Sequence, residues 1–175
     1  MKRHLVLVGL PGSGKSTVGR LAAEYWPDQI PHYTDLDESI VAEAARSIPE
    51  IFARAGERGF RRLERDAMES ALTRPPHLIS AGAGWIAEPG NLDAARVHHV
   101  RIVYLQVRPE VAHARLAGAT DRPLLQGVDR LGQLSALLAA REPWYRLADA
   151  EIDAAGPPEE VVSSLRAVGA RWSLW

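Results

Sequence analysis

The sequence predicts an α/β fold in which a parallel sheet carries helices on both faces. Short β-type runs alternate along the chain with longer segments whose apolar residues recur at helical spacing. The chain has 175 residues, which is about the size of one domain and enough to bury a well-ordered core. We therefore expect residues 1–175 to form a single domain.

The predicted strands and helices follow one another from the N-terminus. A strand is predicted at residues 5–9 with a helix at 15–26, and a second strand at 31–37 with a helix at 38–46. Further strands are predicted at residues 77–82, 101–107 and 151–155, with helices between and after them. Strands that alternate with helices pair in parallel, because each helix carries the chain back to the same end of the sheet.

The segment from residue 47 to residue 72 carries signals for the start and the end of helices. Ser47 and Glu50 form a capping-box pattern ahead of the run IFARA, and Gly56 is a stop signal. Residues 57–72 then predict a helix. Its apolar residues at helical spacing are Phe60, Leu63, Ala67 and Leu72.

The composition is that of an ordinary soluble globular protein. The sequence is 46% hydrophobic and 25% charged with a formal net charge of -1, so we expect no nucleic-acid partner. The absence of cysteine excludes disulfides and cysteine-ligated metals and fits a reducing compartment. The apolar run near the N-terminus, residues 5–8, is too short for a signal peptide or a membrane span. We expect a cytoplasmic monomer without a membrane partner.

The segment GLPGSGKST, residues 9–17, matches the phosphate-loop pattern G-x-x-x-x-G-K-[ST]. An apolar run precedes it and a helical pattern follows it, which is the context that separates a phosphate loop from a chance glycine-rich turn. Lys15 is expected to reach the β- and γ-phosphates, and the Ser16 hydroxyl to bind magnesium. The remaining residues expected at the nucleotide are Gly12, Ser13, Gly14 and Thr17.

A phosphate loop alone does not define what the triphosphate is used for. The sequence lacks the Asn-Lys-x-Asp motif with which GTPase switches bind guanine. Motor ATPases have an apolar strand that ends in Asp, whereas the run HLISAGAG passes through Ser80 into glycines. Glycines leave space and open N–H groups beside the phosphates for a second substrate, which favours phosphoryl transfer to a small molecule.

Six segments in this order resemble the shikimate kinase family over nearly the whole chain: GLPGSGKSTVGR, DLDESI, RSIPEIFARAGERGFRRLE, SAGAG, DRPLL and REPWYRLAD. The resemblance implies a three-layer P-loop kinase fold, in which helices flank a five-stranded parallel sheet and a mobile lid closes over the site. It also implies the cofactors ATP and Mg²⁺, and transfer of the γ-phosphoryl group to the 3-hydroxyl of shikimate. The lid is expected at residues 118–129, which are rich in turn-forming residues.

The resemblance assigns different roles to two neighbouring carboxylates. Asp35 is expected near magnesium through water, and Asp37 is expected to accept hydrogen bonds from the substrate hydroxyls and to help take the attacking proton. On an extended strand their side chains would point to the same side. An alternative is that the pair serves as a helix N-cap followed by an acidic first turn, and Asp37 could have both roles.

Four arginines carry over from the family in the same way. Arg61 and Arg141 match its carboxylate-binding arginines, whose planar forks suit a carboxylate. Arg122 matches the lid arginine, and Arg115 stands where the family stacks a guanidinium on adenine, although a plain surface role is open for it. Two guanidinium groups in one pocket would repel each other, which predicts an anionic ligand between them.

The chain departs from the family at the glycine-rich segment. Gly82, Ala83 and Gly84 stand where the family has three glycines, and Trp85 follows them. A methyl group at residue 83 would be unfavourable if that position required φ > 0, and Trp85 would either narrow the acceptor pocket or belong to the core.

Two alternatives to a shikimate kinase remain open. One is a kinase of the same fold that acts on another hydroxylated carboxylate such as gluconate. The other is a non-catalytic ATP-dependent switch, against which the set Lys15, Asp37 and Arg122 argues.

Overall fold

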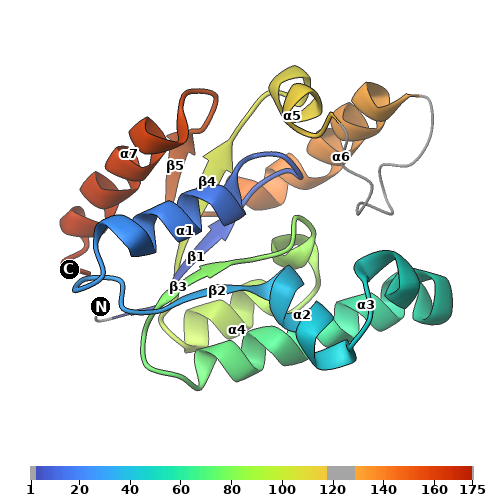
Figure 1. Ribbon diagram of the computed structural model, residues 1–175, viewed down its shortest axis with the longest axis horizontal. Helices are drawn as coiled ribbons and strands as arrows, with labels where there is room; N and C mark the ends of the chain where they lie inside the picture. The colour runs from blue at the N-terminus through green and yellow to red at the C-terminus, as the bar shows by residue number, and fades with distance from the viewer. Residues whose placement is uncertain (1–2, 118–128, 175) are drawn as a thin grey trace.

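The computed structural model describes residues 3–117 and 129–174 and confirms the predicted sheet (Figure 1). Its five strands have the order β2-β3-β1-β4-β5, and every neighbouring pair is parallel. The strands are β1 (Leu5–Val8), β2 (Tyr33–Asp35), β3 (Leu78–Ser80), β4 (Arg101–Gln106) and β5 (Ala150–Asp153). The carboxyl ends of β1, β2 and β3 therefore meet at one edge, where parallel sheets place their ligands.

Helices cover both faces of the sheet, which makes three layers (Figure 1). They are α1 (Lys15–Tyr25), α2 (Leu36–Ala44), α3 (Ile48–Leu72), α4 (Asn91–Val97), α5 (Pro109–Arg115), α6 (Arg130–Tyr145) and α7 (Pro158–Arg171), with a short 3-10 helix η1 at Trp85–Ala87. None of the helices in the described residues has both the length and the apolar composition that a membrane crossing needs.

Alternate residues of the central strand β1 supply two separate apolar cores. Leu5 and Leu7 pack with α1 and α7 on one face, whereas Val6 and Val8 pack with the side of the sheet that carries α2, α3 and α6. All four side chains are fully buried. A strand that is covered on both faces reads as a continuous apolar run, which is why residues 5–8 lack polar alternation.

The helix signals around α3 are confirmed. The Ser47 side chain accepts from the Glu50 N–H while Glu50 Oε2 accepts from the Ser47 N–H, which is a complete capping box. Helical geometry is interrupted at Gly56, where φ is 63°. This left-handed conformation favours glycine and separates the two helical segments that the sequence predicts.

The predicted extent of the second strand is wrong. β2 ends at Asp35, and α2 begins at Leu36 instead of residue 38. Asp35 and Asp37 are therefore not paired by strand alternation. The chain turns at Asp35, because this side chain accepts hydrogen bonds from the N–H groups of Asp37 and Glu38 and caps α2.

Candidate active site

The glycine-rich loop between β1 and α1 has the geometry that its sequence predicts. Gly9, Gly12 and Gly14 all have positive φ. At Gly12 a side chain is also excluded by space, because a Cβ atom there would lie 2.7 Å from the carbonyl oxygen of Ala112. The loop leads directly into α1, so its N–H groups and the positive end of the helix dipole face the same space.

Lys15, the first residue of α1, lies over this loop. Its ammonium group donates to the carbonyl oxygens of Gly9 at 2.9 Å and Leu10 at 3.0 Å. These bonds hold a full positive charge beside the N–H groups of the loop. The arrangement suits a polyphosphate.

A cavity of about 180 Å³ joins the loop to the ends of β2 and β3. Its lining includes Gly12, Gly14, Lys15, Ser16, Thr17, Asp35, Asp37, Ser80 and Ala83. The two carboxylates thus face the phosphate loop although strand alternation does not put them there. The bend after Asp35 does so instead.

Asp35, and not Asp37, is the N-cap of α2. Its Oδ1 accepts from the backbone of Asp37 and Glu38 at 3.0 and 3.3 Å, and its Oδ2 accepts from the Tyr33 hydroxyl at 3.1 Å. The pair thus forms the N-cap and acidic first turn that the sequence allowed, with the cap at Asp35 and not at Asp37. Asp37 lies in the first turn of α2, and its carboxylate does not cap the helix.

A second cavity, of about 340 Å³, lies on the other side of the loop. Ser13, Gly14, Thr17 and Arg115 line it together with the segment after β5. The Arg115 guanidinium donates to the carbonyl oxygens of Ala155 at 3.0 Å and Gly156 at 3.1 Å, which anchors it at the cavity wall. A planar group fixed beside the phosphate loop suits a nucleotide base.

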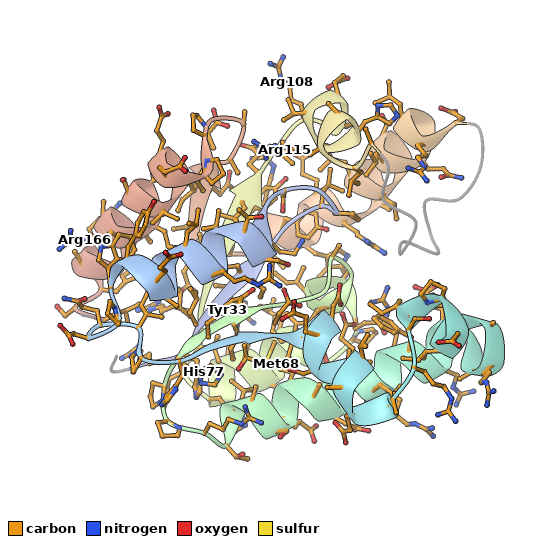
Figure 2. The ribbon with its side chains drawn as sticks, viewed as in Figure 1. Tyr33, Met68, His77, Arg108, Arg115 and Arg166 are labelled. Carbon is orange, nitrogen blue, oxygen red and sulfur yellow. The ribbon has the colours of Figure 1, made fainter. Side chains whose placement is uncertain are left out.

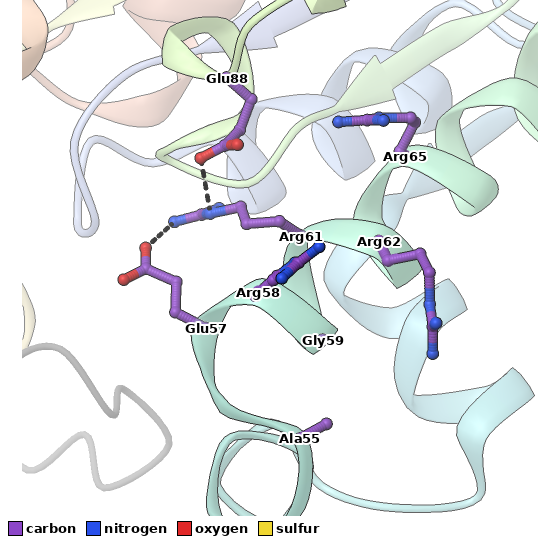
Figure 3. Close-up of a pocket in the computed structure, with 8 residues that line it drawn as sticks. All are labelled: Ala55, Glu57, Arg58, Gly59, Arg61, Arg62, Arg65 and Glu88. Carbon is purple, nitrogen blue, oxygen red and sulfur yellow. Dashed lines mark hydrogen bonds and ion pairs between the residues drawn. The ribbon is translucent and has the colours of Figure 1, made fainter.

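Arg61 is the centre of an ion-pair network, part of which Figure 3 shows. Its guanidinium pairs with Glu64 at 2.8 Å, Glu57 at 2.9 Å and Glu88 at 3.3 Å. Three carboxylates already compensate its charge, so the argument that the charge of Arg61 requires an anionic ligand fails. Burial raises the pKa of Glu64 above its ordinary value, and the charge of Arg61 opposes this shift.

Two glycines make room for this network. A Cβ atom at Gly84 would lie 2.6 Å from Cζ of Arg61, and one at Gly82 would collide with the carboxylate of Glu64. The same position at Gly82 is 3.5 Å from Oδ1 of Asp37. The glycine-rich segment thus brings the aspartate of α2 next to the Arg61–Glu64 pair of α3.

Of the two residues that depart from the family pattern, Ala83 does not strain the backbone and Trp85 does not line the cavity with the carboxylates. Ala83 is not among the residues with positive φ, so its methyl group causes no backbone strain. Its carbonyl oxygen accepts from the Tyr145 hydroxyl at 2.6 Å. Trp85 is 1% exposed and belongs to the apolar core rather than to the cavity with the carboxylates.

Arg141 reaches the same region from α6. It lies beside the Tyr145 hydroxyl: burial raises the pKa of Tyr145, and the positive charge of Arg141 opposes this shift. Within residues 3–117 and 129–174, no carboxylate forms an ion pair with Arg141. Its charge is therefore less compensated than that of Arg61.

Comparison with known proteins identifies the family. A sequence model described as "Shikimate kinase" matches residues 11–168. This chain belongs to the shikimate kinase family.

Individual shikimate kinases resemble it over most of their length. The chain is 44% identical over 148 residues to a shikimate kinase from Mycobacterium avium, covering 85% of this chain and 81% of the relative. It is 38% identical over 168 residues to one from Trichormus variabilis, covering 94% and 90%. A structure of shikimate kinase from Acinetobacter baumannii in complex with shikimate matches with a TM-score of 0.86 at 30% identity, covering 97% of this chain and 94% of that one.

The membership confirms that the protein is an ATP-using kinase with a three-layer P-loop fold. Its expected lid, residues 118–129, falls almost entirely outside the described residues, and so does Arg122. Sequence reasoning missed three residues that hold this shikimate kinase site together, namely Tyr33, Glu64 and Tyr145. The position of Glu64 one helical turn after Arg61 was a usable signal for an ion pair. Nothing in the sequence indicates the contact of Tyr145 with Ala83.

Proposed function

We infer that this protein transfers the γ-phosphoryl group of ATP to the 3-hydroxyl of shikimate. The observation that carries the proposal is the cavity that brings Lys15 and Asp37 together, with Glu64 behind Gly82 and Arg61 behind Gly84. Three functional groups thus follow one another along the site. Lys15 and its loop suit phosphates, the Asp37 carboxylate can accept a hydroxyl proton, and the Arg61 guanidinium suits an acidic substrate. The Acinetobacter baumannii relative is described as a complex with shikimate.

The phosphate end relies on charge that is in place before the reaction. The loop N–H groups of residues 12–17 bind the phosphates, and the Lys15 ammonium stabilises the negative charge on the transferred group. Its two bonds to the carbonyls of Gly9 and Leu10 set the height of the ammonium above the loop. Arg115 positions the base from the neighbouring cavity.

Ser16 and Asp35 fit a magnesium ion that is bound together with phosphates. Both line the cavity and offer a hydroxyl and a carboxylate oxygen, and Mg²⁺ in such sites takes one or two protein ligands and keeps several waters. In the described part of the chain no group of three or more His, Cys, Asp or Glu side chains could hold a metal. This donor set agrees with an ion shared with the nucleotide. The ion would neutralise charge on the phosphate oxygens.

Asp37 is proposed to orient the acceptor hydroxyl and to take its proton. Its place in the first turn of α2 is fixed by the cap at Asp35, while its own carboxylate faces the cavity. Removal of the proton as the new bond forms lowers the barrier to attack. Gly82 permits the substrate to approach, because any side chain there would occupy the space between Asp37 and Glu64.

The acceptor carboxylate is proposed to bind Arg61 and Arg141, with Arg122 of the expected lid closing over it. Glu57 is the partner of Arg61 that would yield, because its side chain is 53% exposed and an exposed ion pair contributes about 0–1 kcal/mol. Glu64 is 1% exposed and would stay in place. The substrate carboxylate would thus take the place of the Glu57 carboxylate in the ion pair with Arg61.

The test is a coupled assay of ADP formation with shikimate, quinate, gluconate and neutral cyclitols as acceptors. We expect the highest kcat/KM with shikimate. An analogue with the carboxylate replaced by a neutral amide should lose about 10²-fold in kcat/KM, since charge-assisted hydrogen bonds contribute about 1.5–3 kcal/mol each. Gluconate as the best acceptor would establish the alternative kinase, and a neutral polyol as the best acceptor would refute a carboxylate substrate.

A further inference from the structure

The hydroxyl group of Tyr33 lies at a junction of three elements of the site. It is 3.1 Å from Oδ2 of Asp35 in β2, 2.9 Å from Oγ of Ser80 at the end of β3, and 3.5 Å from the carbonyl oxygen of Ser16 in α1. The Ser80 hydroxyl in turn donates to the carbonyl oxygen of Lys15 at 3.0 Å. A single phenol thus links the aspartate expected near magnesium to the first turn of the phosphate-binding helix.

The side chain of Tyr33, labelled in Figure 2, has little freedom to move. It packs against Gly19 in α1, where a Cβ atom would lie 2.7 Å from Cζ of the ring. Glycine in the interior of a helix is unfavourable by roughly 0.5–1 kcal/mol relative to alanine. The ring therefore occupies space that a larger residue in α1 would fill, and its hydroxyl cannot move far from Asp35.

The hydroxyl protons at this junction are too few for all of its contacts. Tyr33 and Ser80 each have one proton. An ionised Asp35 and the Lys15 carbonyl only accept, so donation to both leaves no proton between Tyr33 and Ser80, which are 2.9 Å apart. In a second arrangement Tyr33 donates to Ser80, Ser80 donates to the Lys15 carbonyl, and Oδ2 of Asp35 is open to another donor.

We propose that Tyr33 is a positioning residue that orients Oδ2 of Asp35 toward the phosphate loop and yields that oxygen to a water molecule of a nucleotide-bound magnesium ion. Oδ1 of Asp35 is occupied as the helix cap, so Oδ2 is the oxygen whose direction the tyrosine controls. Ser80 Oγ accepts the hydrogen bond of the Tyr33 hydroxyl when Oδ2 changes partner, and the proton stays on the tyrosine. The inference rests on the proposed function only in its use of a magnesium–nucleotide complex.

The experiment compares the wild-type protein with Tyr33→Phe by titration calorimetry of ADP, with and without Mg²⁺ and without any acceptor. Phenylalanine keeps the ring against Gly19 and removes only the hydroxyl. Tyr25→Phe is the matched control, because Tyr25 is 48% exposed at the end of α1, the helix against which the Tyr33 ring packs. Thermal unfolding of all three proteins reports on packing.

We expect Tyr33→Phe to bind ADP without Mg²⁺ within about twofold of the wild-type affinity. The gain, that is the factor by which Mg²⁺ increases the affinity for ADP, should be about tenfold smaller in this variant, because residues that orient a metal ligand typically contribute at least that much. Tyr25→Phe should keep the full gain. An unchanged gain in Tyr33→Phe would overturn the proposal, and so would an equal loss with and without Mg²⁺. Shikimate turnover by the wild type is measured separately, so failure of the substrate assignment would not be mistaken for failure here.

Discussion

Gly84 lies directly against the guanidinium group of Arg61, with the position of a Cβ atom at Gly84 only 2.6 Å from Cζ. Gly84 does not need φ > 0, since its φ is -96°. The glycine is therefore required by the space that the arginine occupies. The ion pairs of Arg61 with Glu57 and Glu64 restrict how far the guanidinium could retreat.

Gly84→Ala should raise the KM for shikimate at least about tenfold, because displacement of Arg61 weakens a charge-assisted bond to the acceptor. The KM for ATP should change little, since neither Gly84 nor Arg61 lines the two cavities beside the phosphate loop. Ala83→Gly is the matched control and should alter both constants less than about twofold, given its ordinary φ. Steady-state kinetics with each substrate varied would check this, and equal effects of the two substitutions would contradict it.

Lys15→Ala should lower kcat about 10²-fold to 10³-fold or more, because the lysine places charge where it builds up during phosphoryl transfer. The two hydrogen bonds to Gly9 and Leu10 disappear with it, so folding stability should be compared by thermal unfolding. Near-normal turnover in a correctly folded variant would refute the role of the phosphate loop.

Asp37→Asn and Asp35→Asn should separate the two carboxylates. Asp37→Asn should lower kcat about 10²-fold to 10⁴-fold with little change in ATP affinity, since it removes the proton acceptor. Asp35→Asn keeps a good N-cap residue on α2, so its effect should be on Mg²⁺ dependence rather than on folding. Turnover measured across Mg²⁺ concentrations distinguishes the variants. A shift in Mg²⁺ dependence for Asp37→Asn would reassign that residue to the metal.

The exposed and buried partners of Arg61 should behave differently on removal of their charge. Glu57→Gln should lower the KM for shikimate about twofold to threefold, because an exposed pair contributes little and its carboxylate competes for the same guanidinium. Glu64→Gln should reduce the free energy of unfolding by about 1.5–3 kcal/mol through loss of a buried charged hydrogen bond. Steady-state kinetics test the effect of Glu57→Gln on the KM, and urea denaturation tests the effect of Glu64→Gln on stability. A larger loss of stability in Glu57→Gln than in Glu64→Gln would reverse the assignment.

His4 and His77 should make stability fall in mild acid. Both are buried, their rings are 5.0 Å apart, and burial lowers the pKa of each below its ordinary value. The unfolded chain then binds more protons than the folded one below about pH 6.5, so stability decreases as pH drops through that value toward the lowered pKa values. His4→Asn, which keeps an acceptor for the His77 N–H, should weaken this dependence. Urea denaturation between pH 5 and pH 8 gives the comparison, and parallel curves of stability against pH for the two proteins would exclude a contribution from His4.

Local patterns were enough to predict much of the fold and part of the site. The phosphate loop, the capping box at Ser47 and the break at Gly56 each depend on the conformations of neighbouring residues, and all three are confirmed. The predicted extent of β2 is wrong, because the helix cap formed by Asp35 ends the strand earlier than the sequence pattern suggests. Side-chain hydrogen bonding to the backbone outweighed strand propensity at this position.

The sequence by itself determined the α/β class, the phosphate-binding loop and the residue types available for phosphoryl transfer, because these depend on periodicity and on contiguous motifs. Tertiary structure decided which side chains meet. Because residues 82 and 84 are glycines, Asp37 of α2 lies close to Glu64 and Arg61 of α3. Trp85 is buried in the apolar core and does not line the cavity. The three carboxylates around Arg61 come from two segments, and one of them, Glu88, is distant in sequence. The contact with Glu88 and those of the two glycines depend on the packing of elements far apart along the chain, for which a local pattern contains no signal.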